Sequence, residues 1–157
     1  MTTVAWDGET LAADRLTVGG NLKRTITKLY VCGDFVYGGA GMVIEIMQVV
    51  DWLRRGAKTI NSPSASSKDD CGVCGIAIHK SRKAFIVEWN ESHTRLMPCE
   101  EPAWAIGCGR DFAIAAMACG KTAAEAVEIA ARFDAGTGHG VNVVRFGRKW
   151  PPTIETV

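Results

Sequence analysis

The first residues of the chain carry a pair of groups that can work together as a catalyst. Thr2 follows Met1, and its small side chain permits the normal removal of an initiator methionine. Removal leaves a hydroxyl and a free α-amine on one residue, so that the amine takes the hydroxyl proton while the oxygen attacks a carbonyl carbon. An α-amine titrates near ~8 and needs little adjustment to act as a base. Many chains begin with Met-Thr-Thr, so the rest of the sequence must decide.

Two further motifs carry chemical residue types, and each has a simpler interpretation. Cys71 and Cys74 have the spacing of a zinc or redox site, but no second cysteine pair accompanies them. The segment 119–122 resembles the end of a phosphate-binding loop, yet a helix precedes it rather than a strand. A capping box formed by Thr122 and Glu125 explains it better. The three histidines are scattered and predict no Ser-His-Asp or Cys-His arrangement.

Length and composition indicate one ordinary globular domain covering residues 1–157. Apolar residues make up 47% of the chain and charged residues 22%, and the net charge is +1. This charge gives no electrostatic case for nucleic acid or an anionic membrane, and no apolar run is long enough to span a bilayer. Six cysteines in a chain without an export signal are expected to be reduced thiols, which predicts a cytoplasmic protein.

The pattern of apolar residues and turn signals predicts the elements that position Thr2. A hairpin is expected over 2–6 and 10–14 around Asp7-Gly8, followed by a glycine-bearing loop through residues 19–21. The remaining predicted strands are 23–31, 35–37, 73–78, 84–89, 94–96 and 140–146. The predicted helices are 42–55, 110–118 and 122–132, and the segment 60–70 is a polar surface loop. Because helix 110–118 is nearly all apolar or small, we expect it to be buried on two sides.

Strands in antiparallel groups and helices in blocks predict an α+β fold with two mostly antiparallel sheets and helices outside. Along these predicted strands and helices, one set of residues has the order and spacing of a single family. The set is Thr2, Asp14, Lys28, the glycine run 38–41, Gly107-Cys108-Gly109 and Asp134 with Thr137-Gly138. The chain resembles the proteasome β-subunit and its bacterial relative HslV, the threonine peptidases of the N-terminal nucleophile hydrolases. The resemblance runs from Thr2 to about Phe146.

The resemblance implies a four-layer αββα sandwich that cleaves peptides or unfolded protein inside a homo-oligomeric ring. It implies no metal or organic cofactor, and it admits an ATPase unfoldase as a partner. Thr2 would be the nucleophile, and the charge of Lys28 would favour its neutral amine and the forming alkoxide. Asp14 would pair with the buried Lys28. A backbone N–H of Gly38 would stabilise the oxyanion of the tetrahedral intermediate.

The same resemblance assigns roles to five more residues. Val36 and Ala40 would line the pocket for a small or medium apolar substrate side chain. Asp134 and Thr137 would hold the Thr2 amine by hydrogen bonds, with Cys108 beside them. Relatives usually have serine where this chain has Cys108 and Thr137, and a thiol is the weaker hydrogen-bond partner.

Two alternatives concern the register and the helical layer. The turn after Lys28 is short against the family, and another register would put Lys23 or Arg24 in the place of Lys28. The polar loop 60–70 stands where relatives carry a longer second helix, so a slimmer helical layer is expected.

Three other functions stay open: an inactive structural homologue of the same fold, an amidase acting on a small molecule, and a metal- or redox-binding module at Cys71 and Cys74.

Overall fold

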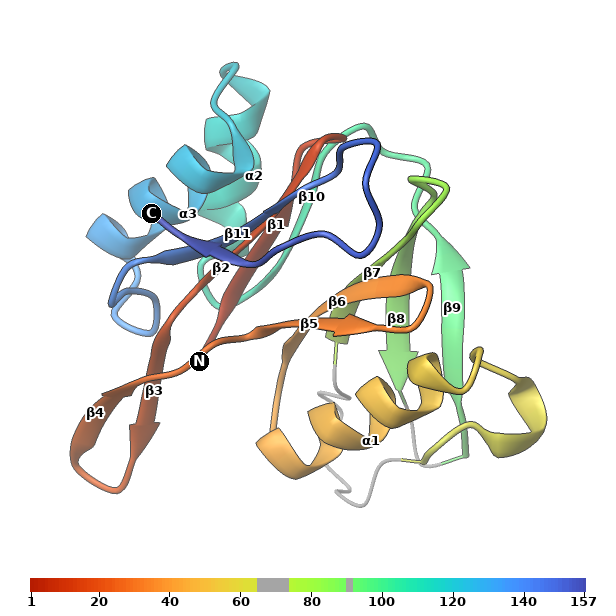
Figure 1. Ribbon diagram of the computed structural model, residues 1–157. Coiled ribbons are helices and arrows are strands. Elements are labelled where there is room, and N and C mark those ends of the chain that lie inside the picture. Colours follow the sequence, from red (N-terminus) through yellow and green to blue (C-terminus); the bar gives the residue numbers. More distant parts are fainter. Residues whose placement is uncertain (65–73, 90–91) are drawn as a thin grey trace.

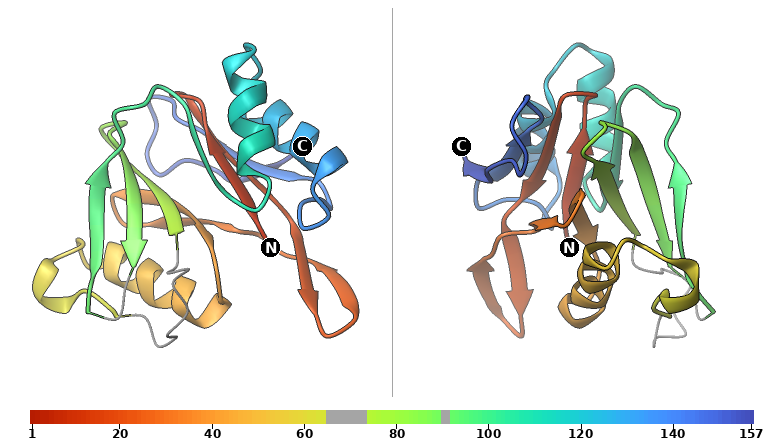
Figure 2. Two further views of the ribbon diagram at one scale, coloured as in Figure 1. Left: turned by 180° about the vertical axis from the view of Figure 1, so that it is seen from behind. Right: turned by 45° about the vertical axis from the view of Figure 1, so that its right-hand side comes forward.

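Alternating apolar residues along the strands produce two antiparallel sheets that face each other in the computed structural model, with helices on both outer faces (Figures 1 and 2). The structure describes residues 1–64, 74–89 and 92–157. Within these ranges the layers follow the order helix, sheet, sheet, helix. The predicted αββα sandwich is therefore confirmed.

The first sheet holds the N-terminal strand in its interior. Its strand order is β10 (Trp104–Gly107), β1 (Thr3–Trp6), β2 (Thr10–Asp14), β11 (Val141–Arg145) and β12 (Glu155–Thr156). The helices α2 (Arg110–Ala118) and α3 (Ala123–Phe133) cover its outer face. Small side chains such as Ala5, Ala12 and Ala126 form this contact, which lets the helices approach the sheet closely. The predicted capping box of Thr122 and Glu125 begins α3.

The second sheet runs in sequence order: β5 (Leu29–Cys32), β6 (Phe35–Ala40), β7 (Cys74–His79), β8 (Ala84–Trp89) and β9 (Thr94–Pro98). The helix α1 (Val43–Arg54) packs on its outer face through Ile46, Val49, Val50 and Leu53. A single 3-10 turn, η1 (Thr59–Asn61), follows it. In the described ranges no second long helix joins α1 on this face, so the helical layer here is slim, as the polar segment predicted.

The core between the two sheets closes the sandwich. It gathers the inward side chains of both sheets, which are Val4, Trp6, Leu11, Ala13, Leu29, Val36, Ile76, Ile78, Ile106, Val144 and Phe146. The edge-to-face contact of Trp6 with Phe146, at 5.3 Å between ring centroids, lies in this layer. Because β1 contributes to both the helix-facing and the sheet-facing core, the residues just before it are held firmly.

Three sequence predictions differ from the structure. The segment around residues 19–21 is the turn of a separate hairpin, β3 (Leu16–Gly19) and β4 (Leu22–Thr25), and the predicted strand 23–31 is split between β4 and β5. Helix α2 is buried on one side only, since Phe112, Ala115 and Ala118 are exposed. No strand was predicted after residue 146, and the last residues add β12 to the first sheet.

Two other sequence predictions concern the cysteine pair with its neighbouring loop, and the absence of a membrane-spanning segment. Cys71 and most of the 60–70 loop lie outside the described residues, as does the side chain of Cys74. None of the helices in the described ranges has the length and apolarity needed to cross a bilayer.

Candidate active site

The N-terminal segment is fixed by backbone contacts with the loop that follows β10. Thr3 pairs with Gly107, and the Cys108 N–H donates to the Thr2 carbonyl oxygen at 2.9 Å. Gly107 has φ +94°, and a side chain on it would place its Cβ 1.8 Å from that carbonyl oxygen. Only glycine fits there. Thr2 is thereby held at the start of β1 with 5% of its surface exposed.

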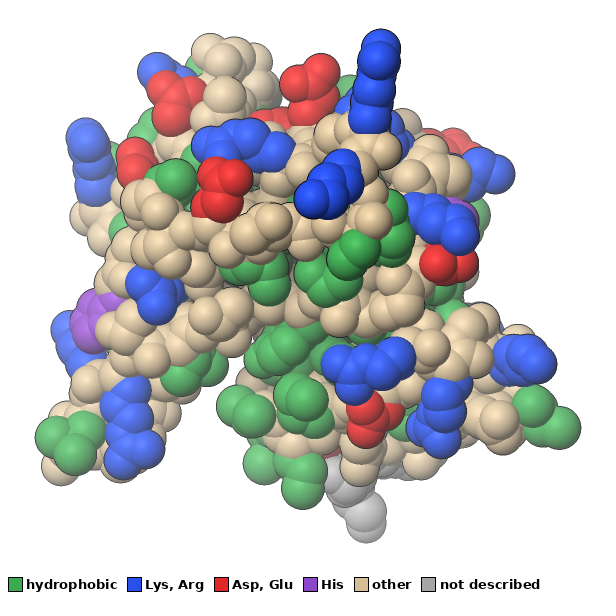
Figure 3. Space-filling view, in the orientation of Figure 1, with side chains coloured by type: hydrophobic (Ala, Val, Ile, Leu, Met, Phe, Trp, Pro, Cys, Tyr) green, Lys and Arg blue, Asp and Glu red, His purple; other side chains and the backbone are tan. Residues whose placement is uncertain are grey.

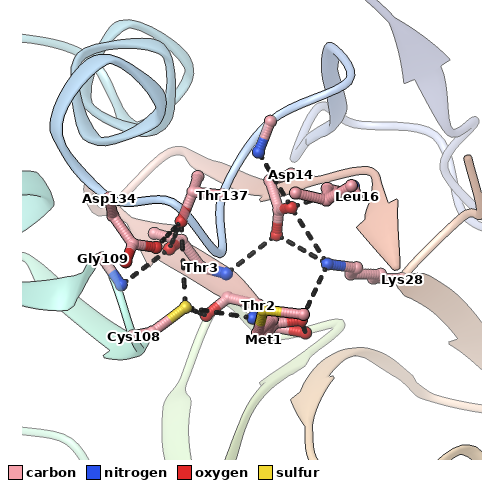
Figure 4. Close-up of polar contacts among 11 residues, drawn as sticks. Met1, Thr2, Thr3, Asp14, Leu16, Lys28, Cys108, Gly109, Asp134 and Thr137 are labelled. Atoms are coloured by element: carbon pink, nitrogen blue, oxygen red, sulfur yellow. Dashed lines mark hydrogen bonds and ion pairs between the residues drawn. The ribbon is translucent and has the colours of Figure 1, made fainter. Parts of the chain in front are cut away.

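A buried ion pair lies on one side of Thr2. The Lys28 ammonium donates to both carboxylate oxygens of Asp14, at 2.8 and 3.0 Å. Asp14 is fully buried and also accepts backbone N–H groups of Thr3, Leu16 and Gly138 at 2.8, 3.0 and 3.2 Å (Figure 4). Burial lowers the pKa of Lys28, and the charge and hydrogen bonds of Asp14 oppose that change. The carboxylate therefore keeps a buried ammonium satisfied beside the threonine.

The register of this pair excludes the alternatives that the sequence left open. Lys23 and Arg24 lie exposed on β4, whereas Lys28 is 3% exposed and forms the ion pair. The short loop between β4 and β5 brings Lys28 inward after the hairpin has turned away from the sheets. Lys28 is thus the cation that accompanies Thr2.

A carbonyl oxygen lies where the hydroxyl and the ammonium meet. The Thr2 hydroxyl donates to the Met1 carbonyl oxygen at 2.5 Å, and the Lys28 ammonium donates to the same oxygen at 3.2 Å (Figure 4). Two donors, one of them cationic, polarise a carbonyl group. The arrangement can therefore stabilise negative charge on an oxygen that lies next to the Thr2 hydroxyl.

A second group of polar side chains lies on the other side of Thr2. The Thr2 backbone N–H contacts the Cys108 sulfur at 3.3 Å. The Thr137 hydroxyl lies 4.0 Å from that sulfur, 2.6 Å from the Thr3 hydroxyl and 2.5 Å from the Asp134 carboxylate to which it donates. Although burial alone would raise the pKa of Asp134, hydrogen bonds from Cys108, Thr137 and the Gly136 backbone lower it overall.

The contacts of Asp134 and Thr137 in the structure do not include the Thr2 nitrogen, which is a peptide N–H while Met1 is attached. Their hydrogen bonds go to each other and to Thr3 and Cys108, and the predicted hydrogen bonds to the free Thr2 amine stay a prediction. Cys108 alone of the three contacts the nitrogen. Its sulfur is larger than the oxygen of a serine and occupies the space between Thr2 and Thr137.

A pocket of about 140 Å³ opens beside Thr2. Its lining residues come from the N-terminus, the β3–β4 hairpin, β5, β6 and α1: Met1, Thr2, Thr17, Val18, Ile26, Lys28, Tyr30, Gly39, Gly41, Val43 and Ile46. The predicted pocket residues Val36 and Ala40 are not among them. Val36 is fully buried between the sheets, and Ala40 packs against the same core. The α-carbon of Gly38 also faces that core, against Val4 and Leu29, and the oxyanion role of its N–H stays a prediction.

Sequence reasoning missed two groups of residues at this site. Thr3 links the two sides, since its N–H bonds Asp14 and its hydroxyl accepts the Gly109 N–H at 3.0 Å. The alternation of β1 offered a signal, because Thr3 stands opposite in direction to Val4. The pocket residues of the hairpin and of α1 carried no such signal, since they are distant in sequence and of ordinary types. In the described ranges, no cluster of His, Cys, Asp or Glu could hold a metal ion.

Two comparisons with known proteins show what the chain is similar to in sequence and in fold. The chain is 29% identical over 183 residues to proteasome subunit beta 1 of Thermococcus gammatolerans, covering 98% of this chain and 91% of that protein. It also superposes on the structure of Thiobacillus denitrificans BPH in complex with epoxomicin, with a TM-score of 0.62 and 18% identity, over 93% of this chain and 98% of that chain. No protein-family model matches the chain. The chain is thus proteasome β-subunit-like in sequence and fold.

Proposed function

We propose that this chain, similar in sequence and fold to proteasome β-subunits, is a threonine-type endopeptidase with Thr2 as its N-terminal nucleophile after Met1 is removed. One observation carries the proposal. The Thr2 hydroxyl and the Lys28 ammonium converge on one carbonyl oxygen, beside a pocket large enough for a substrate side chain. Substrate carbonyls would take the place that the Met1 carbonyl has in the structure.

The proposed reaction uses protein groups throughout. The Thr2 amine, freed by loss of Met1, takes the hydroxyl proton, and Oγ1 adds to the substrate carbonyl carbon. The amine then gives that proton to the leaving nitrogen as the C–N bond breaks, which leaves an ester on Thr2. A water molecule, deprotonated by the same amine, hydrolyses this ester and restores the hydroxyl. Cys108, which contacts the nitrogen at 3.3 Å, would orient the amine.

Lys28 would supply electrostatic stabilisation rather than a proton. Its positive charge favours the neutral form of the nearby amine and the negative charge that develops on the attacked carbonyl oxygen. Because burial lowers the Lys28 pKa, Asp14 is needed to keep the ammonium charged. We propose that Gly38 contributes a further N–H to the oxyanion.

The pocket favours a medium apolar side chain on the substrate. Its walls include Val18, Ile26, Val43 and Ile46, with Tyr30 among them, and Lys28 is the sole charged side chain in the lining. In the described ranges β3 pairs only with β4, so its other edge has unpaired backbone groups next to the pocket. An extended peptide could add to that edge by main-chain hydrogen bonds while its side chain fills the pocket.

The test is the intact mass of the purified protein before and after a peptide epoxyketone, a reagent that needs both the hydroxyl and the free amine of an N-terminal threonine. We expect loss of Met1 and one adduct, which is absent from Thr2→Ala and retained in Thr3→Ser, the matched control at the next residue. A chain that keeps Met1 and forms no adduct would contradict the proposal and favour the inactive structural homologue. An adduct with cleavage of small amides but not peptides would favour the amidase. The ring and the ATPase partner stay predictions.

A further inference from the structure

The sulfur of Cys108 lies in contact with the nitrogen and the carbonyl oxygen of Thr2. The Thr2 N–H donates to Sγ at 3.3 Å, and the thiol donates to the Thr2 carbonyl oxygen at 3.4 Å. The Cys108 N–H donates to the same oxygen at 2.9 Å, so backbone and side chain together hold the two residues. The nitrogen of the proposed nucleophile and an oxidisable sulfur are therefore neighbours, although 106 positions separate them in sequence.

Solvent reaches this sulfur, whereas the residue beside it is buried. Cys108 is exposed, and Thr2 keeps 5% of its surface accessible. On the face shown in Figure 3 the surface is hollowed between the β3–β4 hairpin and α1, where the pocket beside Thr2 opens. A small solute therefore reaches the sulfur from outside while the nitrogen lies behind it.

Met1 packs over the same place, and its removal uncovers both atoms. A Cβ on Gly136 would lie 2.8 Å from the Cys108 sulfur and 3.0 Å from Cγ of Met1, so the methionine side chain and the sulfur both lie against Gly136. Removal of Met1, which belongs to the proposed function, takes this side chain away and turns the Thr2 N–H into a free amine. A neutral amine is a nucleophile, whereas the lone pair of a peptide nitrogen is delocalised.

Charged groups on both sides act on the sulfur. Burial lowers the pKa of Lys28, and the charges of Asp14 and of a Cys108 thiolate oppose that change, so the ammonium and the thiolate attract each other. On the other side, burial raises the pKa of Asp134 and a hydrogen bond with Cys108 lowers it. A nearby cation and an acceptor for the thiol proton suit a sulfur that reacts as a nucleophile.

We propose that Cys108 is a site of reversible oxidation, at which a hydroperoxide links its sulfur to the Thr2 amine as a sulfenamide. The thiolate first attacks the terminal peroxide oxygen: the S–O bond forms, the O–O bond breaks, and the sulfur is oxidised to a sulfenic acid. The peroxide is reduced and leaves as water or an alcohol with the thiol proton. The amine then attacks the sulfur, the S–N bond forms, and the hydroxyl leaves as water with one proton from the nitrogen.

The S–N bond would stop catalysis without destroying the site. The nitrogen in this bond no longer serves as the base for the Thr2 hydroxyl, a role worth about a hundredfold or more in rate. A thiol that attacks the sulfur breaks the S–N bond and protonates the amine, and a second thiol then releases the Cys108 thiol as a disulfide forms between the two reagents. The effect on rate rests on the proposed function, whereas the bond itself requires only that Thr2 is the first residue.

Peptide mapping after treatment with hydrogen peroxide tests the bond. The full chain is prepared with Thr2 as its first residue, by removal of an N-terminal fusion, and the digestion is done without reducing agent. We expect the N-terminal peptide joined to the peptide that holds Cys108, with a mass about 2 Da below the sum of the two, because one thiol hydrogen and one amine hydrogen are lost. Dithiothreitol should separate the two peptides again.

Two variants are the controls. Cys108→Ser should give no joined peptide, whereas Cys119→Ser, which removes another exposed thiol, should give it as the wild type does. Peptide cleavage by the wild type should fall by about a hundredfold or more in peroxide and return with dithiothreitol.

Three results decide between the proposals. Peroxide that leaves Cys108 as a sulfenic acid trapped by dimedone, or as a sulfinic acid, with no joined peptide, would overturn the inference. A joined peptide that also forms in Cys108→Ser would overturn it as well. A joined peptide in a chain whose reduced form cleaves no peptide would support the S–N bond and count against the proposed function alone.

Discussion

At the scale of single residues, the buried pair of Asp14 and Lys28 connects the fold to the chemistry. Asp14 accepts three backbone N–H groups, from β1, from β3 and from the loop after Thr137, in addition to the ammonium. One carboxylate thus holds together three segments that surround Thr2. Removing its charge should disturb stability as well as the site.

Asp14→Asn is expected to reduce the free energy of unfolding by about 3–5 kcal/mol, since it leaves the Lys28 ammonium buried without a counter-charge. Urea denaturation followed by fluorescence measures the loss. The control is Asp34→Asn, because the Asp34–Lys80 pair is about half exposed and should contribute less than about 1 kcal/mol. Equal losses in the two variants would show that the buried pair has no special weight.

Cys108 is the side chain that contacts the Thr2 nitrogen, and its thiol is a weak hydrogen-bond partner. Cys108→Ser should retain or raise kcat/KM on a fluorogenic peptide, because a hydroxyl can accept from the amine and still reach Thr137. Cys108→Ala, which removes the contact, should lower kcat/KM by about tenfold, the worth of one hydrogen bond. If the alanine variant cleaves as fast as the wild type, Cys108 does not orient the amine.

The sequence predicted which residues lie at the site better than how they touch. Six of the predicted residues come together: Thr2, Asp14, Lys28, Cys108, Asp134 and Thr137. The first four end or adjoin strands of recognisable pattern, and the last two follow the well-marked helix α3. The contact of Asp134 and Thr137 through Cys108 was not predictable, because it depends on differences of about an ångström in a loop. Val36 was predicted to line the substrate pocket but lies fully buried between the sheets, because the sequence pattern does not say how deep in the sandwich a strand residue lies.

At the scale of elements, the loop 107–109 transmits the position of β10 to the N-terminus. The Cys108 N–H holds the Thr2 carbonyl, and the Gly109 N–H holds the Thr3 hydroxyl. Both contacts depend on the close approach that Gly107 permits. The loop therefore sets the direction in which Thr2 enters the site.

Gly107→Ala tests the loop against a matched control. Both Gly107 and Gly120 have positive φ, at +94° and +85°, but a Cβ on Gly120 meets nothing within 4 Å, whereas on Gly107 it meets the Thr2 carbonyl oxygen. Gly120→Ala should cost about 1–2 kcal/mol, the conformational cost alone. Gly107→Ala should cost clearly more and abolish the epoxyketone adduct. Similar thermal stabilities for the two variants would contradict the role of the close approach.

Elements with a strong local pattern were predicted well, and those that depend on distant contacts were not. The bounds expected for α1, α2 and β2 agree with the structure within a residue or two, because caps and periodicity mark them. The β3–β4 hairpin was missed, since its alternation has no apolar face to signal burial. The composition of α2 suggested two buried faces, but small side chains pack on the sheet by one face and tolerate water on the other.

At the scale of the whole molecule, the sandwich has three hydrophobic cores: one between α2, α3 and the first sheet, one between the two sheets, and one between the second sheet and α1. Thr2 and its partners lie at an edge where the first sheet, the second sheet and the hairpin meet. Cys32 is fully buried in the core between α1 and the second sheet, and it has no part in the candidate active site. Such a group reports on global unfolding, since it meets water only when the sandwich opens.

Cys32 predicts how the stability of the molecule depends on alkaline pH. Burial raises the pKa of its thiol from 9.0 to about 12, against a smaller lowering by Arg54. The unfolded chain therefore releases this proton above pH 9.0 while the folded chain keeps it, so stability that is fully present below pH 9.0 is lost as the pH rises toward about 12. Between about pH 7.5 and about pH 10.5 the loss from this one thiol is about 2 kcal/mol.

The measurement compares urea unfolding at those two pH values in the wild type, in Cys32→Ala and in Cys119→Ala. Cys32→Ala lowers stability at both values by opening a cavity, but it should lose about 2 kcal/mol less than the wild type between them. Cys119→Ala removes an exposed thiol and should keep the wild-type difference. Parallel losses in all three proteins would mean that the second sheet and α1 admit water to Cys32 before the molecule unfolds, and that the two helical layers of the sandwich open independently.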